Sequence, residues 1–503
     1  MSLGSGQSGG AGALTQLIAH GAVDSYLIHD SQLTFWKVRY SRHTMFAMES
    51  ISQPFNTSVA FGNEAQITLN RNGDLVYYMY LLIDLPAICA IDRTKEPGAA
   101  VGIGPQFPTY HTNVCNPCQK NDELIYADYI VGDFTEASST GKNDMMSKAK
   151  NAYMREQYKN AAAMDCCDDA EDCPDNLCPE LEGVWCHWTN AIGQYLIRSV
   201  RIVIGGSTID CLYQDFLFMW EELSGKAGRR LTELIGKRYT RTQLICDSRQ
   251  RRFIYTPLPF WFSQFSGHAL SLTSLQFHGV QIHVEFERLD RCIVVSNPDV
   301  GVKNCSTSCC LSNSDLACCL ETTYVYLDTA ERDRFATTHF EMLLVQTQAH
   351  YHQTTTSNIR MQLNFNHPCL ELIWAVRRQC QEKCNNWFNY SGVDNRDPMI
   401  SASLLLNNQA RMASKPAVYY RLVQPYQHHS NIPDCFIYVY SFALHPEDSS
   451  PSGSCNFSRI DHVDLMLNLQ DGLAKEQVTI VVFARTWNVL RFKEGLAGVA
   501  FAN

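Results

Sequence analysis

The segment from Phe436 to Phe442 limits the fold more than any other part of this sequence. Alternate side chains of an extended chain point to opposite sides, so four aromatic residues share one side while Ile437 and Val439 share the other. A strand that is apolar on both sides must be covered on both sides. Prolines and glycines flank the segment and interrupt any helix there. The region therefore predicts short buried strands joined by turns.

Short strands of this kind recur through the second half of the chain. Apolar and polar residues alternate, for example, from Val463 to Leu469. Eight such segments are predicted as strands: 342–348, 362–365, 370–376, 401–406, 418–423, 436–442, 463–469 and 478–483. Eight antiparallel strands fit either an open β-sandwich or a jelly roll, and the pattern alone leaves both topologies open.

The first half of the chain has the same character. Residues 65–69 and 75–85 are predicted strands, and Asn72-Gly73 between them favours a tight hairpin. Residues 200–204 alternate in the same way and end at a turn, Gly205-Gly206. One helix is predicted from apolar residues at helical spacing, namely Phe216, Met219, Trp220 and Leu223.

Composition excludes several classes of function. With 51 acidic and 41 basic residues the formal net charge is −10, so no surface for direct nucleic-acid binding is expected. The sequence contains no HExxH motif, Walker loop or nucleotide-binding fingerprint, and neither a catalytic site nor a cofactor is predicted. It also lacks a secretory-signal layout and any run of 18 apolar residues, so we expect synthesis in the cytoplasm.

Of the 21 cysteines, seven lie between Cys115 and Cys186 and five between Cys305 and Cys319, which marks two local clusters rather than a disulfide framework along the whole chain. Candidate disulfide cysteines are Cys115, Cys118, Cys166, Cys167, Cys173, Cys178, Cys186, Cys305, Cys309, Cys310, Cys318 and Cys319. Closely spaced thiolates also suit zinc, but no second C-x-x-C motif completes a known spacing, and no metal site is predicted. Disulfides in loops and reduced thiols both stay open as alternatives, because a chain made in the cytosol needs later oxidation to form disulfides.

Four Asn-x-Ser/Thr sequons occur in the sequence, at Asn56, Asn304, Asn389 and Asn456. Asn304 and Asn389 lie in loop-like sequence and are the candidate N-glycosylation sites. Asn456 lies within the motif stretch 418–461 and is expected to be buried.

Several motifs resemble those of one protein family. The stretch 418–461 closely resembles a signature of the major capsid proteins of nucleocytoplasmic large DNA viruses, which infect eukaryotes. Further similar motifs lie in both halves of the chain, at 71–75, 188–193, 258–262, 327–332, 363–368, 488–491 and 501–503.

This resemblance implies an all-β fold of two consecutive eight-stranded antiparallel jelly rolls, a double jelly roll, with short helices and long loop insertions. The expected layout is a flexible N-terminal arm (1–23), a first jelly roll (24–292) with a cysteine-rich insertion at about 91–186, a cysteine-rich inter-domain segment (293–320) and a second jelly roll (321–503).

The resemblance also implies a function. It predicts a structural major capsid protein that trimerises into pseudo-hexagonal capsomers and builds an icosahedral shell. Expected partners are other copies of the chain, minor capsid and penton proteins, and an internal viral membrane at the inner face. The expected location is the virion, after assembly in the host cytoplasm. The alternative from a different class is a carbohydrate-binding β-sandwich lectin, assisted by a metal in the cysteine- and acid-rich loops.

Overall fold

The structure is a computed structural model, and it describes residue 15 and residues 18–19, 42–92, 184–225, 231–296, 300–306 and 310–501. All of its sheets belong to one compact unit, residues 46–503. The predicted arm, 1–23, and the predicted insertion, 91–186, lie largely outside the described residues.

The first half of the chain forms two facing antiparallel sheets. One sheet has the order β1 (Phe46–Pro54), β13 (Ala317–Leu327), β3 (Leu75–Leu85) and β8 (Arg252–Pro257), with β9 (Leu270–Ser271) paired to β3. The other has the order β2 (Glu64–Thr68), β10 (Val280–Phe286), β6 (Ile197–Ile204) and β7 (Ser207–Tyr213). Successive strands repeatedly change sheet, which is the connectivity of a jelly roll.

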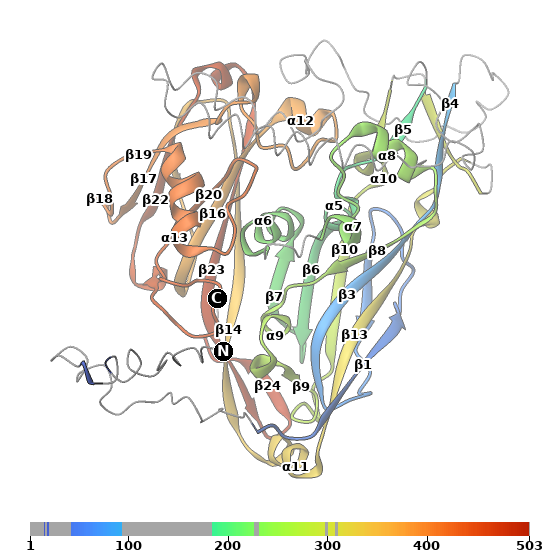
Figure 1. The fold of residues 1–503 in the computed structure, drawn as a ribbon, viewed down its shortest axis with the longest axis vertical. Helices are drawn as coiled ribbons and strands as arrows, with labels where there is room; N and C mark the ends of the chain where they lie inside the picture. Colours follow the sequence, from blue (N-terminus) through green and yellow to red (C-terminus); the bar gives the residue numbers. More distant parts are fainter. Residues whose placement is uncertain are drawn as a thin grey trace, which may run out of the picture. The chain divides into compact units, whose positions relative to one another are not determined.

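The second half repeats this topology. Its first sheet has the order β14 (Phe340–Thr354), β23 (Val478–Lys493), β16 (Pro368–Arg378) and β20 (Ile437–Ser441), with β21 (Cys455–Asn456) and β24 (Leu496–Val499) at the side. Its second sheet contains β15 (Asn358–Gln362), β22 (Val463–Leu469) and β17 (Met399–Leu406), the last paired with β18 (Gln409–Ala410) and β19 (Lys415–Pro416). The fold is all-β and a double jelly roll, as expected (Figure 1).

Small sheets and short helices complete the structure. The two small sheets pair β4 (Ile88–Asp92) with β12 (Val300–Asn304) and β5 (Cys186–Trp188) with β11 (Ile293–Val295). The α-helices in the part of the chain that the structure describes are α5 (Ile192–Tyr195), α6 (Gln214–Ser224), α7 (Thr232–Ile235), α8 (Arg241–Ser248), α9 (Trp261–Gln264), α10 (Leu289–Cys292), α11 (Thr329–Thr337), α12 (Gln379–Lys383) and α13 (Gln424–His428). A π-helical turn, η6 (Tyr419–Val423), precedes α13, and the 3-10 turns are η3 (Ser266–His268), η4 (Asn313–Asp315), η5 (Val393–Asn395), η7 (Phe457–Arg459) and η8 (Asp471–Lys475).

The strand predicted at 436–442 is present as β20. Its residues from Ile437 to Tyr440 are all buried, because β20 pairs with β16 and is also in contact with the helical residues 419–428 before it. The predicted helix is α6, and its four apolar residues are buried. Both glycines of the predicted Gly205-Gly206 turn have positive φ, and β6 pairs with β7 across it.

The predicted hairpin at 65–85 is wrong. β2 and β3 lie in different sheets, and the connection between them crosses from one sheet to the other. Gly73 does not have a positive φ. Its lack of a side chain instead allows Tyr324 to pack closely against the Gly73 backbone, because a Cβ at residue 73 would lie 2.8 Å from the Cβ of Tyr324.

The predicted strand at 418–423 is also wrong, since this segment is the π-helical turn η6. Within it only Tyr420 is buried, and together with the flanking buried residues Ala417 and Gln424 it follows helical spacing rather than strand alternation. Tyr420 reaches between the sheets, where its ring packs edge-on against Trp374 and its hydroxyl donates to the Ala402 carbonyl at 2.8 Å.

Strand pairing differs from the predicted layout around residue 320. β11, β12 and β13, which span the predicted inter-domain segment 293–320, all pair with strands of the first half. β13 continues to Leu327, so residues 321–327 also complete a sheet of the first half. The cysteine- and serine-rich composition concealed a strand whose alternate residues Leu320, Thr322 and Tyr324 are fully buried. α11 follows, with the Asp328 side chain accepting from the Thr329 amide at its start, and leads to β14.

Candidate functional site: the contact between the two halves

A large buried contact joins the first half (residues 46–327) to the second (residues 340–501). α6, which directly follows β7 of the first half, lies at its centre (Figure 1). The rings of Phe218 and Phe388 stack 4.2 Å apart, and Phe216 packs edge-on against Phe483 of β23. One hydrophobic core cluster therefore runs through both halves.

A buried ion pair crosses the contact beside these rings. Asp215, near the start of α6, accepts from Arg377 Nη1 of β16 at 2.7 Å and from the Tyr390 hydroxyl at 3.0 Å. Arg377 also contacts Glu382 at 3.0 Å. Because Asp215 and Arg377 are both almost fully buried, each depends on the other for charge compensation.

Two strands of different halves also meet directly. Gln346 of β14 donates to the Ile209 carbonyl of β7, and the Thr347 amide donates to Asp210 Oδ1 at 3.0 Å. Burial raises the pKa of Asp210 to about 7, although hydrogen bonds from the Thr347 and Cys211 amides act in the opposite direction. Asp210 thus serves as a hydrogen-bond acceptor that fixes β14 against β7.

The loop after α12 inserts two side chains into the first half. Asn385 donates to the carbonyls of Asp290 and Ile293 at 2.9 and 2.7 Å. Trp387 stacks on Tyr195 with 4.9 Å between ring centroids and donates to the Arg291 carbonyl at 3.0 Å. The Asn385 backbone is left-handed, a conformation that asparagine tolerates better than most residues.

A cluster of four charged side chains completes the contact. Glu371 of β16 accepts from Arg485 of β23 and from His429, each at 2.8 Å. His429 also contacts Glu447 at 2.9 Å, and the Arg485 guanidinium lies 3.7 Å from the centre of the Trp220 ring of α6. His429, Glu371 and Arg485 have almost no exposed surface.

These groups fix one half against the other through apolar, ionic and hydrogen-bonded contacts. The sequence had indicated α6, but not the partners of its polar residues. Two strands that are buried on both faces contain the charged residues Arg377, Glu371 and Arg485. A charged residue inside such an apolar strand was the sequence signal that could have indicated a buried ionic contact.

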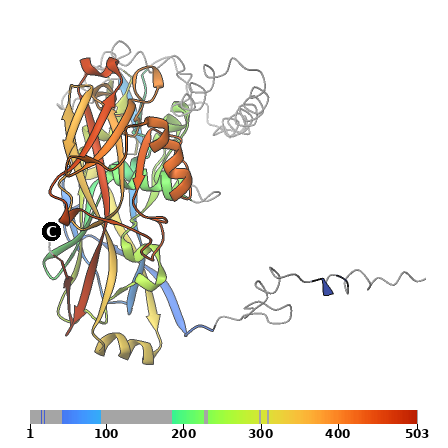
Figure 2. The ribbon, with the colours of Figure 1, turned by 90° about the vertical axis from the view of Figure 1, so that its left-hand side faces the viewer.

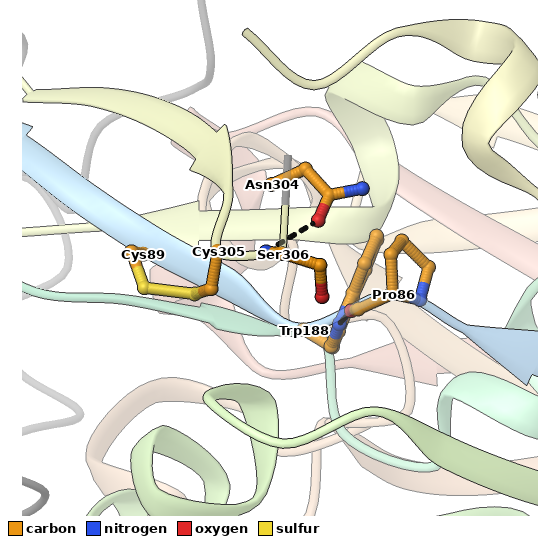
Figure 3. Close-up of a disulfide and its surroundings, with 6 residues drawn as sticks. All are labelled: Pro86, Cys89, Trp188, Asn304, Cys305 and Ser306. Carbon is orange, nitrogen blue, oxygen red and sulfur yellow. Dashed lines mark hydrogen bonds between the residues drawn. A yellow bond between two sulfur atoms is a disulfide. The ribbon is translucent and has the colours of Figure 1, made fainter. Parts of the chain in front are cut away.

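Of the candidate disulfide cysteines, Cys305 forms a disulfide with Cys89, 216 positions away in the sequence (Figure 3). Cys89 was not a candidate, because only the pairing of β4 with β12 brings the two residues together. Cys186, Cys310, Cys318 and Cys319 form no disulfide in the structure. Burial raises the pKa of the Cys186 thiol to about 12 and also raises that of Cys318. The remaining candidates, Cys115, Cys118, Cys166, Cys167, Cys173, Cys178 and Cys309, lie outside the described residues.

Both candidate glycosylation sites are buried. Asn304 Oδ1 accepts from the Ser306 amide at 3.0 Å beside the disulfide (Figure 3), and Asn389 Oδ1 accepts from the Ser391 amide at 3.0 Å. A glycan would have to be attached to either residue before the chain folds. Asn56 and Asn456 are instead exposed, and for Asn456 this reverses the expectation of burial.

Within the described ranges, no group of three or more His, Cys, Asp or Glu side chains is arranged to hold a metal ion. In the same ranges, none of the helices has the length and apolar character needed to cross a membrane.

Comparisons with known proteins agree with this fold. A family model described as large eukaryotic DNA virus major capsid protein matches residues 331–498, and one described as major capsid protein N-terminus matches residues 34–107 and 162–328. The major capsid protein of Pyramimonas orientalis virus is 31% identical over 520 residues, covering 98% of this chain and 100% of the relative. That of Phaeocystis pouchetii virus is 29% identical over 608 residues, with the same coverage.

Solved structures show the same fold. A quasi-atomic model of the PBCV-1 virus capsid matches with a TM-score of 0.62 and 24% identity, covering 93% of this chain and 100% of the other. The Faustovirus major capsid protein matches with a TM-score of 0.62 and 11% identity, covering 96% of each chain.

Fold and comparisons together define a structural, shell-forming class of protein. The chain belongs to the family of large eukaryotic DNA virus major capsid proteins. Its role is structural rather than enzymatic, and as a capsid protein it is a component of the virion. The lectin alternative is not supported, because every comparison described here leads to capsid proteins.

Proposed function

We propose that the chain builds a viral shell as a homotrimer, in which the second half of one copy docks on the first half of the next. Three copies then present six barrels in a ring, which gives a nearly hexagonal tile. The contact between the halves uses a sheet of the second half and a helix of the first half. The supporting observation is that the corresponding sheet of the first half and the corresponding helix of the second half are both uncovered in the single chain.

Of the two corresponding sheets, the one in the second half is covered by the first half. β16 and β23 are buried on both faces over most of their length, because α6 and β7 cover the side that faces away from their own barrel. β3 and β13 hold the same positions in the first half, yet alternate residues along them stay exposed or half-buried. Exposed apolar residues of this open sheet are Phe46, Met48, Tyr78, Phe253 and Tyr255.

The docking element of the second half is α13. It lies between β19 and β20, just as α6 lies between β7 and β8, so the two helices are topological equivalents. α6 lies between the halves, whereas α13 stands in front of β16 and β20 in the view of Figure 1, a position that the turned view in Figure 2 also shows. Only its C-terminal end adjoins the first half, where the His429 ring lies 6.3 Å from the Trp220 ring of α6. Apolar residues on and just before α13 are exposed, among them Tyr426, Val423 and Val418. An α13 docked like α6 would meet the open sheet of the next copy.

The boundary between the two jelly rolls follows from the strand pairing. We propose that the first jelly roll ends with β13 at Leu327, that α11 is the connection, and that the second jelly roll begins with β14 at Phe340. The family models divide between residues 328 and 331, which supports this boundary.

The wider assembly follows from the family. We propose that trimers contact neighbouring trimers, minor capsid proteins and penton proteins, that the inner face approaches an internal membrane, and that assembly takes place in the host cytoplasm. Relatives described as major capsid proteins support this role.

Light scattering coupled to gel filtration tests the trimer. The expected mass is three times the 57.0 kDa of the chain. Tyr426→Glu, at a residue 77% exposed in the single chain, should shift the protein towards monomer. Phe277→Glu, at a residue 74% exposed on the β9–β10 connection, is the matched control and should stay trimeric. A wild-type protein that remains monomeric at every concentration contradicts the proposal.

A further inference from the structure

His429 is held between two carboxylates. Its Nε2 lies 2.8 Å from Glu371 Oε2, its Nδ1 lies 2.9 Å from Glu447 Oε1, and the side chain is fully buried. An ionised carboxylate only accepts hydrogen bonds, so both ring nitrogens must carry a proton. The geometry therefore requires a positively charged histidine.

Charge balance around the ring depends on that proton. Glu371 also accepts from Arg485 at 2.8 Å, so two carboxylates face two cations in an enclosed space. With a neutral His429, one negative charge would stay buried without compensation, and one of the two hydrogen bonds to the ring would be lost. The cluster is complete only while the histidine is protonated.

The residues after His429 hold the end of α6. Glu447 accepts from the amide and hydroxyl of Ser430. The Asn431 amide donates to the Leu223 carbonyl at 3.0 Å, and the Asn431 side chain donates to the Glu222 carbonyl at 2.8 Å. Carbonyls in the last turn of a helix lack partners within the helix. Segment 429–431 of the second half thus caps α6 of the first half.

We propose that His429 is a proton-dependent latch between the two halves. When protonated, it binds Glu371 and Glu447 and holds segment 429–431 on α6. Loss of its proton releases this segment and loosens the contact around Trp220. The latch acts within one chain, so it does not rest on the proposed trimer.

The electrostatic surroundings agree with this geometry. Charged groups face the cluster from β16 (Glu371), β23 (Arg485) and the connection after β20 (Glu447), while α6 contributes the Trp220 ring. Burial lowers the pKa of His429, but the two carboxylates outweigh it and raise the pKa to about 9. Stabilisation by a raised histidine pKa is complete below the unfolded value of about 6.5 and is lost as pH rises through about 9.

Thermal unfolding between about pH 6 and about pH 10 tests the latch, with the unfolding midpoint followed at each pH. The wild-type midpoint should fall by roughly 2–4 °C or more as pH rises through about 9, beyond the fall seen in His429→Gln. His429→Gln should have a lower midpoint at about pH 6 and lack this alkaline step. His428→Gln, at the half-buried neighbouring residue whose Nδ1 lies 3.0 Å from the Leu444 carbonyl and faces no carboxylate there, is the matched control and should show the alkaline step of wild type. Equal pH dependence of wild type and His429→Gln would overturn the proposal.

Hydrogen exchange at neutral pH tests where the latch acts. In His429→Gln, exchange of the Asn431 amide and of amides in the last turn of α6 should accelerate about tenfold or more, while amides of α11 should not change. Unchanged exchange at Asn431 would contradict the proposed link. If His429→Gln does not fold, Glu447→Gln removes one of the two carboxylates and should move the alkaline step to lower pH. An unmoved step would then refute the latch.

Discussion

Arg377 and Asp215 come from different halves of the chain and meet in a buried ion pair, with 2.7 Å between Arg377 Nη1 and Asp215 Oδ1. The pair lies beside stacked aromatic rings and at the first turn of α6, whose last turn is capped by the second half. These contacts join the two barrels into one compact unit, which suits a chain whose function is its shape.

Removal of one partner should therefore destabilise the whole unit. Asp215→Asn leaves the Arg377 charge buried with only Glu382 beside it, so the free energy of unfolding should fall by about 3 kcal/mol. Chemical denaturation measures this loss. Glu285→Gln breaks the exposed pair with Arg198 and is the control, with an expected change below about 1 kcal/mol. Equal effects of the two substitutions would mean that the buried pair does not hold the halves together.

Asp210 should make stability fall between acid and neutral pH. Its pKa is raised in the folded chain to about 7, so its contribution is greatest below the unfolded value of 3.8 and is lost as pH rises through about 7. Asp210→Asn keeps an oxygen for the Thr347 and Cys211 amides and removes this titration. The variant should be more stable than wild type at about pH 8 by on the order of 2–4 kcal/mol, and the two should converge near about pH 4. A wild-type protein equally stable at both pH values would argue against a raised pKa.

The disulfide between Cys89 and Cys305 should stabilise the oxidised chain. It closes a loop of 216 positions, so Cys89→Ser should lower the free energy of unfolding by about 2–4 kcal/mol in non-reducing buffer. After reduction of the wild type, the difference should disappear. Peptide mapping without reductant should recover the linked peptide. Recovery of Cys305 bonded to another cysteine would contradict this pairing.

Gly73 should tolerate no side chain. Gly73→Ala places a Cβ 2.8 Å from the Tyr324 Cβ on β13, and the expected cost is about 1–3 kcal/mol. Gly267→Ala meets no atom within 4 Å and serves as the control, with a change of about 0.5 kcal/mol or less. Thermal unfolding of both variants measures the difference. Similar midpoints for the two would rule out the close approach.

Local pattern predicted the elements whose own side chains indicate their burial. Ile437 to Tyr440 are apolar on both sides of the strand and are all buried, and the apolar residues of α6 follow helical spacing. The segment around Tyr420 was misread because a π-helical turn buries residues at a spacing that a short window cannot separate from a strand.

The contact between the halves was not predictable from local pattern. Asp215 and Arg377 are 162 positions apart, and Cys89 and Cys305 are farther, so neither sequence neighbourhood contains its partner. Asn72-Gly73 has the composition of a hairpin turn, yet Tyr324 explains the glycine through a contact from the far end of the first half. Packing and strand pairing between segments that are distant in the sequence determine all three contacts, and local patterns do not indicate which distant segments meet.

Electron cryomicroscopy of the purified chain tests the proposed trimer. The expected particles contain three copies with six barrels in a ring, in which α13 of each copy packs on the sheet formed by β1, β13, β3 and β8 of the next. Particles in which α13 faces solvent, or in which two copies meet across a two-fold axis, would contradict it.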